Sequence, residues 1–131
     1  MLILRSFIPF AYLLAAIVNI APAIGALSDE IVVQLYAVQI HSTEISLLLR
    51  HRAVLFAIIG GLLLAAAVME DLRTTAGLAG LSSMSAFMLL LVVTGAENAR
   101  LTQVALIDSA ATLVLLTAFV AHLKSTQRVR N

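Results

Sequence analysis

The chain has 131 residues, of which 62% are hydrophobic and 11% are charged, and its formal net charge is +1. An ordinary soluble domain is about 45–50% apolar and about 25% charged, so this composition predicts one small membrane domain covering residues 1–131. The weak net charge, without a basic run with interleaved aromatics, excludes nucleic acid as an expected partner, and the absence of cysteine excludes disulfides and thiolate sites.

Four apolar runs are long enough to cross a hydrocarbon core of about 30 Å, which takes roughly 20 helical residues. They cover residues 7–27, 53–69, 76–96 and 104–123. Because lipid-facing backbone must form hydrogen bonds within its own segment, and alternating strand patterns do not occur, we expect helices. The predicted fold class is all-α, an integral membrane bundle of four transmembrane helices.

The first run has an alternative interpretation as a secretory signal peptide. Arg5 precedes it, and the segment Ala21-Pro22-Ala23 loosely resembles a small-residue cleavage site. We favour a membrane span, because the run is long for the core of a signal peptide and Pro22 lies inside the cleavage site.

The first loop, residues 28–49, is predicted to contain a short helix lying in the membrane interface. Ser28 is a suitable N-cap, two acidic residues follow it, and apolar residues then recur at helical spacing. Ser42 can cap a second helix start, so the helix of the second span is expected to begin near Thr43, ahead of the apolar run.

The distribution of Lys and Arg predicts the orientation in the membrane. One side carries Arg5, Arg73, Lys124, Arg128 and Arg130, and the other carries Arg50, Arg52 and Arg100. This excess of five over three predicts that both termini lie in the cytoplasm and that the triplet Arg50-His51-Arg52 lies on the outer side.

Small residues at every fourth position predict the packing faces of the first two spans. One stripe comprises Ala11, Ala15, Asn19 and Ala23, and the other comprises Ala53, Ala57, Gly61 and Ala65. The alternative is chance recurrence in a chain rich in small residues. At 100° per residue Arg50 falls on the side of the second stripe and Arg52 falls opposite, so we expect Arg50 to point into the bundle.

Asp108 is the most informative acid, because it lies inside the fourth apolar run. A buried charge needs a partner, and we expect an ion pair with Arg50, which shares its leaflet in the predicted topology. Around this pair we predict a polar cluster that is either a structural lock or a site for a ligand or a proton. The cluster comprises Asn19, Arg50, His51, Glu97, Asn98 and Asp108.

No catalytic residue, cofactor or metal is predicted. His41, His51 and His122 have no metal-ligand spacing, and the serines of the third span have no His and acid partner. The glycines form no loop that could hold a phosphate group.

The segment from Leu47 to Phe56, LLLRHRAVLF, is followed by Gly60-Gly61 and by GLSSMSAF at residues 80–87. In these motifs the chain resembles a group of small bacterial four-helix membrane proteins, some of them labelled phosphopantetheine adenylyltransferase. More loosely, it is similar to DoxX-like proteins and to the sterol-isomerase-like superfamily. The resemblance implies a bacterial inner membrane. It implies no adenylyltransferase activity, because the Gly-Xaa-Phe-Asp-Pro type segment of that soluble enzyme is missing.

The expected function is that of an accessory or scaffold subunit, or of a binder of a lipid or small hydrophobic molecule. The alternatives are a lipid-modifying membrane enzyme that uses a buried acid with His51, and a small oligomeric transporter. Free small-residue stripes favour a homo-oligomer or a place in a larger membrane complex. A binder or an enzyme needs an apolar pocket that reaches the polar cluster, whereas a scaffold needs none.

Overall fold

The computed structural model describes the backbone of residues 2–130 and the side chains of residues 6–127. The side chains of Arg5, Arg128 and Arg130, which entered the predicted topology, lie outside this part. Every regular element within it is helical, which confirms the all-α fold class. The elements are α1 (Leu2–Ile20), the 3-10 helix η1 (Ala21–Ala26), α2 (Asp29–Tyr36), α3 (Thr43–Val68), the 3-10 helix η2 (Glu70–Leu72), α4 (Arg73–Thr94) and α5 (Ala99–Arg130).

Within the part of the chain that the structure describes, four helical segments are long and apolar enough to cross a membrane. They are Ser6–Ala26, Thr43–Val68, Glu70–Thr94 and Ala99–Gln127. The helix of the second span, α3, starts at Thr43, as the Ser42 cap predicted. This start lies ten residues before the apolar run assigned to that span. Large apolar side chains such as Phe10, Ile58 and Leu113 are exposed on the outer faces of these helices, where a membrane protein contacts lipid.

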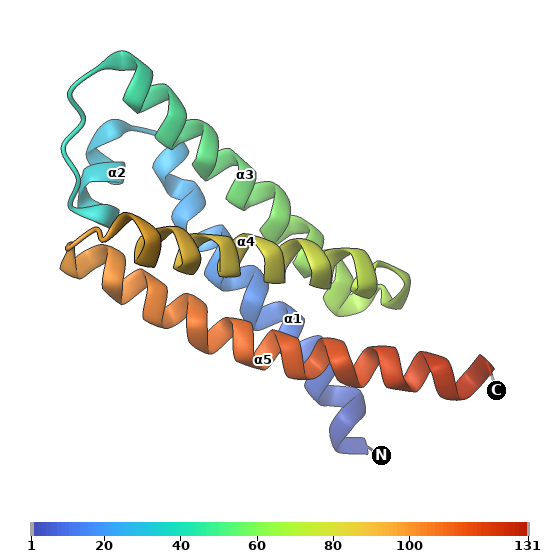
Figure 1. Cartoon of the computed structure of the whole chain (residues 1–131). Helices are drawn as coiled ribbons and strands as arrows, with labels where there is room; N and C mark the ends of the chain where they lie inside the picture. The colour runs from blue at the N-terminus through green and yellow to red at the C-terminus, as the bar shows by residue number, and fades with distance from the viewer. Residues whose placement is uncertain (1, 131) are drawn as a thin grey trace.

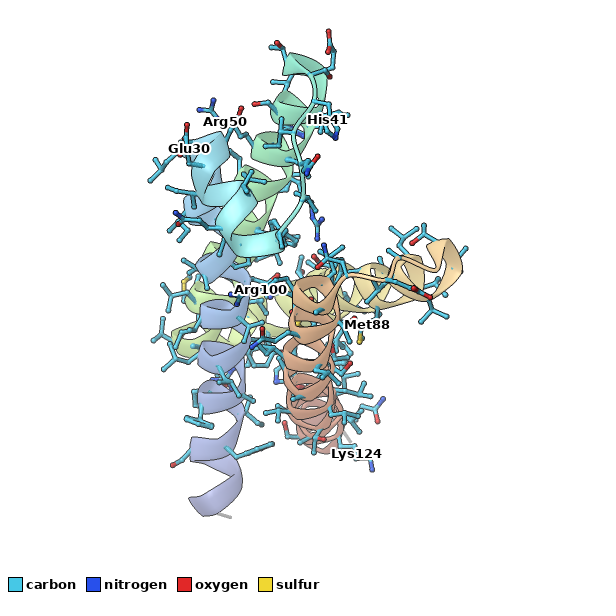
Figure 2. All side chains as sticks on the ribbon, turned by 90° about the vertical axis from the view of Figure 1, so that its left-hand side faces the viewer. Glu30, His41, Arg50, Met88, Arg100 and Lys124 are labelled. Atoms are coloured by element: carbon cyan, nitrogen blue, oxygen red, sulfur yellow. The ribbon has the colours of Figure 1, made fainter. Side chains whose placement is uncertain are left out.

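The helices form an open bundle (Figure 1). Helix α1 packs against α3 and α5, and α4 packs along α5. Helices α3 and α4 are connected by η2 and diverge from it in the shape of a V. The elements η1 and α2 lie at the open end of this V. The two termini lie at the same end, and Figure 2 shows Glu30, His41 and Arg50 at one end of the molecule and Lys124 at the other.

Short polar side chains and one proline determine where these helices begin and end. The Ser28 hydroxyl accepts from Ile31 N–H at 3.4 Å and the Ser42 hydroxyl accepts from Ile45 N–H at 3.3 Å, which confirms both predicted caps. Pro22 has no N–H, and in a continued α-helix its ring would clash with the carbonyl of the preceding turn, so the first span continues as the 3-10 helix η1.

Helix α3 packs on a different face from the predicted one. Its buried residues include Ser46, Ala53, Gly60 and Ala67, which are spaced by seven residues rather than four. In the predicted stripe, Ala57 and Gly61 are exposed. Moving the contact from Gly61 to Gly60 rotates the packing face by 100°. On α1 the prediction holds better, because Ala11, Ala15 and Asn19 are all buried.

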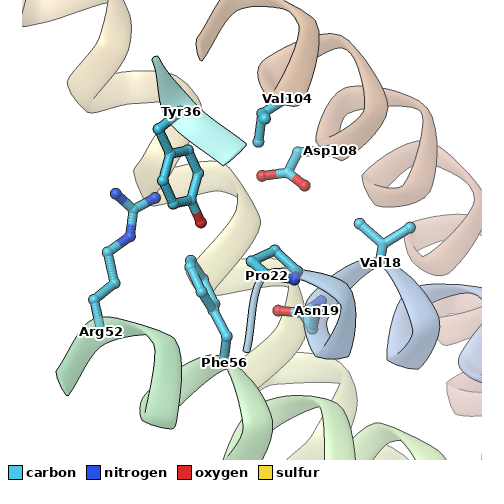
Figure 3. A pocket seen from close by; sticks show the side chains of 8 residues that line it. All are labelled: Val18, Asn19, Pro22, Tyr36, Arg52, Phe56, Val104 and Asp108. Atoms are coloured by element: carbon cyan, nitrogen blue, oxygen red, sulfur yellow. The ribbon is translucent and has the colours of Figure 1, made fainter. Parts of the chain in front are cut away.

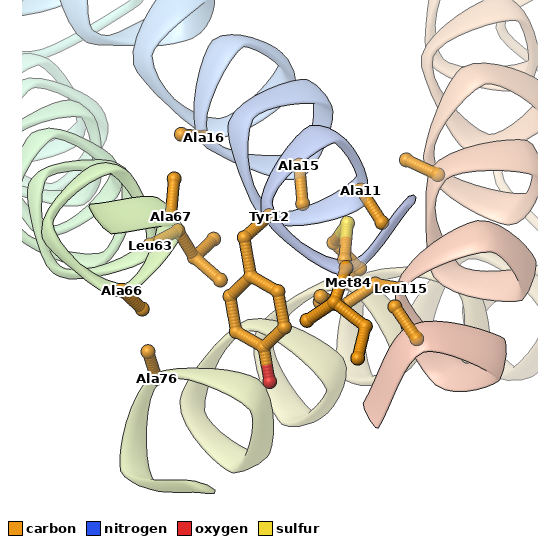
Figure 4. Close-up of a cluster of buried hydrophobic side chains, with 13 residues drawn as sticks. Ala11, Tyr12, Ala15, Ala16, Leu63, Ala66, Ala67, Ala76, Met84 and Leu115 are labelled. Carbon is orange, nitrogen blue, oxygen red and sulfur yellow. The ribbon is translucent and has the colours of Figure 1, made fainter. Parts of the chain in front are cut away.

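The core is a cluster of small and medium side chains around Tyr12, Leu63 and Leu115, which are fully buried (Figure 4). The Tyr12 hydroxyl donates to the Arg73 carbonyl at 2.6 Å. The Arg73 side chain is also buried and donates to the Ala66 carbonyl at 3.2 Å. This second polar centre, near η2, was not predicted from the sequence.

Candidate functional site

The predicted ion pair between Arg50 and Asp108 is wrong. Arg50 is exposed, and its guanidinium donates to the Ala26 carbonyl at 2.9 Å and to the Leu27 carbonyl at 3.5 Å. Among the described side chains it forms no ion pair. Arg50 therefore binds the carbonyl end of η1, where free acceptors and partial negative charge favour a cation.

The packing face of α3 explains why Arg50 does not reach Asp108. With Gly60 and Ala67 at the centre of the contact, Arg50 and Arg52 lie on opposite flanks of the packing face. Arg50 turns toward η1, and Arg52 turns toward α2 and α4. Arg52, and not Arg50 as predicted, therefore lines the pocket that contains Asp108.

A small polar pocket lies where α1, η1, α2, α3 and α5 meet (Figure 3). Its volume of about 10 Å³ suits a single water molecule. Asn19 and Asp108, two members of the predicted cluster, are brought together here. The remaining lining residues are Val18, Pro22, Tyr36, Arg52, Phe56 and Val104.

Arg52 is surrounded by aromatic rings. The carbon at the centre of its guanidinium lies 5.5 Å from the ring centre of Tyr36, 5.0 Å from that of Phe56 and 4.9 Å from that of Phe87. All three distances suit cation–π interactions. Among the described side chains, the guanidinium hydrogen bonds are made by Arg50 and Arg73, and none by Arg52.

In the view of Figure 3 the Tyr36 ring lies between Arg52 and Asp108, and all three side chains line the polar pocket. Burial raises the pKa of the Tyr36 phenol above its ordinary value; the Arg52 charge partly offsets this and the Asp108 charge adds to it. The phenol therefore stays protonated at neutral pH. Tyr36 offers the pocket a hydroxyl group and an apolar ring, and no charge.

Asn98 belongs to this region as a structural link. Its amide nitrogen donates to the Tyr36 carbonyl at 3.1 Å and to the Ala37 carbonyl at 3.2 Å. Its side-chain oxygen accepts from Arg100 N–H at 2.9 Å and from Leu101 N–H at 3.2 Å. Asn98 thus caps α5 and fastens the end of α2 onto it.

Replacing Asn98 by Ala is expected to lower the free energy of unfolding by about 1–2 kcal/mol, because an N-cap and two hydrogen bonds are lost. Unfolding in mixed detergent micelles with increasing dodecyl sulfate, followed by circular dichroism, measures this change. Asn98→Ser is the matched control: its hydroxyl can still cap α5, it loses the two donors to α2, and it should fall between the other two proteins. A Ser variant as unstable as the Ala variant would contradict the capping role.

His51 and Glu97 do not join the polar pocket. Both are exposed, and neither lines this pocket or the groove described next. His122 lies near η2, with its ring nitrogen 3.5 Å from the Thr74 hydroxyl. Among the described residues, no histidine lines the pocket with Asp108, so the geometry gives no support to acid–base chemistry with His51.

A larger apolar groove opens between α3 and α4, where the two helices diverge. Its volume is about 440 Å³. Arg52 and Phe56 line it from α3, and Phe87 lines it from α4. Leu55 and Leu90, which are 44% and 59% exposed, also line it, so the groove is open to the surroundings of the bundle. Arg52 and Phe56 form the wall that this groove shares with the polar pocket.

Arg52, Tyr36 and Phe87 are site residues that the sequence did not reveal. The only local signal is the spacing of Arg52 and Phe56, four residues apart on one helix and therefore on the same side. The contacts with Tyr36 and Phe87 depend on how α2 and α4 pack against α3. Comparison of the chain with known protein families, with curated proteins and with solved structures gave no match.

Proposed function

We propose that the protein binds a membrane lipid in the groove between α3 and α4. The observation that carries this proposal is an apolar groove of about 440 Å³ whose described lining includes one charged side chain, Arg52. Ligand sites of about 300–1,000 Å³ with apolar walls and few polar groups are typical of small-molecule binding. A scaffold subunit has no need of such a groove, so its presence favours a binder.

The length of the groove supports an acyl chain as the occupant. Its wall on α4 extends from Ser83 to Thr94, which is about 16 Å along a helix at about 1.5 Å per residue. Half of a hydrocarbon core of about 30 Å is about 15 Å. A chain from one leaflet therefore matches the groove in length, and it can enter sideways between the exposed side chains of Leu55 and Leu90.

The proposed location is a bacterial inner membrane with both termini in the cytoplasm. The excess of Lys and Arg on the side of the termini supports this orientation, and the termini lie at one end of the bundle. The Arg52 end of the groove then belongs to the outer leaflet, with α2 in the outer interface. The exposed apolar faces leave room for a second copy or for a larger complex.

Filling the groove tests the function. Ala86 lines the groove and is exposed, so Ala86→Trp adds an indole there without removing core packing. Lipid extracted from the purified protein and measured by mass spectrometry should fall well below the amount that the unmodified chain carries. Ala110→Trp, at an exposed position of α5 outside the groove, is the matched control and should retain the lipid. An unmodified chain that carries no lipid, or an Ala86→Trp variant that keeps it, would overturn the proposal.

A further inference from the structure

We infer that the groove selects a phospholipid with an anionic head group, and that Arg52 binds its phosphate. This inference rests on the proposed lipid-binding function and adds the head-group class to it. The acyl chain lies between α3 and α4, and the head group lies at the end of the groove lined by Arg52 and Thr94.

The surroundings of Arg52 leave its hydrogen-bond donors available. A guanidinium has apolar faces and five N–H donors at its edge, in a fork that matches two oxygens of a phosphate. Three aromatic rings lie around Arg52 at cation–π distances and hold it in place. Rings accept no strong hydrogen bond from the edge, and no described carbonyl or carboxylate binds it. The donors therefore remain for an anion, which binds such a group with short, charge-assisted hydrogen bonds.

The charge of the groove favours an anionic over a zwitterionic head group. Arg52 is the one charged residue among the described residues that line it. Asp108 lines the polar pocket on the other side of the Tyr36 ring, and Glu97 lines neither cavity. A choline or ethanolamine group would place a second cation beside Arg52 with no carboxylate in the groove to accept it. A glycerol head group brings no such cation.

Thr94, the other polar residue among the described residues at this end of the groove, does not offer its hydroxyl hydrogen to the phosphate. The Thr94 hydroxyl donates to the Leu90 carbonyl at 2.8 Å within its own helix. Arg50, two residues from Arg52, is engaged by the carbonyls of η1 and does not line the groove. Head-group selection is thus assigned to Arg52 alone, which makes a single substitution decisive.

The absence of tryptophan provides a direct test. Leu90→Trp places one fluorescent reporter at the rim of the groove, and Leu113→Trp places one on a lipid-facing position of α5. Each protein is reconstituted in equimolar phosphatidylglycerol and phosphatidylcholine, with either one or the other lipid brominated so that it quenches a nearby indole. The ratio of the two quenching efficiencies reports which lipid occupies each position.

At the Leu90→Trp reporter we expect phosphatidylglycerol to be preferred roughly fivefold, the ratio given by about 1 kcal/mol per basic residue near a membrane surface. The preference should disappear in Arg52→Gln and persist in Arg100→Gln, which removes an exposed charge outside the groove. At the Leu113→Trp reporter the two lipids should quench equally.

Three outcomes would overturn the inference: equal quenching by the two lipids at the Leu90→Trp reporter, a preference that survives Arg52→Gln, or an equal preference at both reporters. The proposed lipid-binding function would still stand after any of these outcomes if Ala86→Trp lowers the amount of bound lipid. Failure of the proposed function appears instead as lipid extraction that Ala86→Trp leaves unchanged.

Discussion

Gly60→Ala is expected to lower the free energy of unfolding by about 1–3 kcal/mol, the usual cost of overpacking a tight contact. A Cβ atom at this position would overlap Ile20 Cγ1 and would lie 3.1 Å from the Ala16 carbonyl oxygen and from the Ile20 nitrogen. The Ile20 side chain can rotate away, but the backbone atoms of α1 cannot. Helices α1 and α3 must therefore separate at their crossing, and contacts along both helices weaken.

The next residue supplies the matched control. A Cβ atom at Gly61 would have no atom within 4 Å, so Gly61→Ala introduces no clash. It should raise the free energy of unfolding by about 0.5–1 kcal/mol, because Ala loses less backbone entropy than Gly in a helix. Both variants are measured by dodecyl sulfate titration with circular dichroism. Equal shifts in the same direction would contradict the packing of α1 against α3 through Gly60.

Composition and capping signals predicted most of the fold. A membrane helix must satisfy its own backbone, so long apolar runs have one available structure, and the four spans follow from their length. Ser28 and Ser42 marked two helix starts because a cap is a local interaction between residues three apart. Properties set within one helix were therefore readable from the sequence, including the buried stripe on α1.

The sequence did not reveal which face of α3 packs against α1. The wrong placement of Arg50 and Arg52 follows from that. Gly60 and Gly61 are equally small, and it is the packing of α3 on α1 that brings Gly60, rather than Gly61, against Ala16 and Ile20. Choosing Gly61 placed Arg50 inside the bundle and Arg52 outside. Asn19 and Asp108 nevertheless line one pocket. The packing of α3 against α1 thus determines which arginine lines the pocket and the groove.

Arg73→Met is expected to lower the free energy of unfolding by about 2–3 kcal/mol. Arg73 is buried at the turn between α3 and α4, and it donates to the Ala66 carbonyl near the end of α3 and to the Glu70 carboxylate at 2.9 Å. Hydrogen bonds that involve a charged group contribute about 1.5–3 kcal/mol, and an acceptor left without a partner adds a desolvation cost. Unfolding by dodecyl sulfate, followed by circular dichroism, measures the loss.

Glu70→Gln separates the two contacts of Arg73. The Glu70 side chain is 76% exposed, and an exposed ion pair contributes about 0.2–1 kcal/mol, so this variant should remain close to the unmodified protein. If instead both variants lose the same free energy, the ion pair holds the turn and the buried contact with the Ala66 carbonyl contributes little. A large loss confined to Arg73→Met means that the arginine fixes the apex from which α3 and α4 diverge. If the groove holds lipid as proposed, the same variant should also retain less of it, because α3 and α4 form the two walls of the groove.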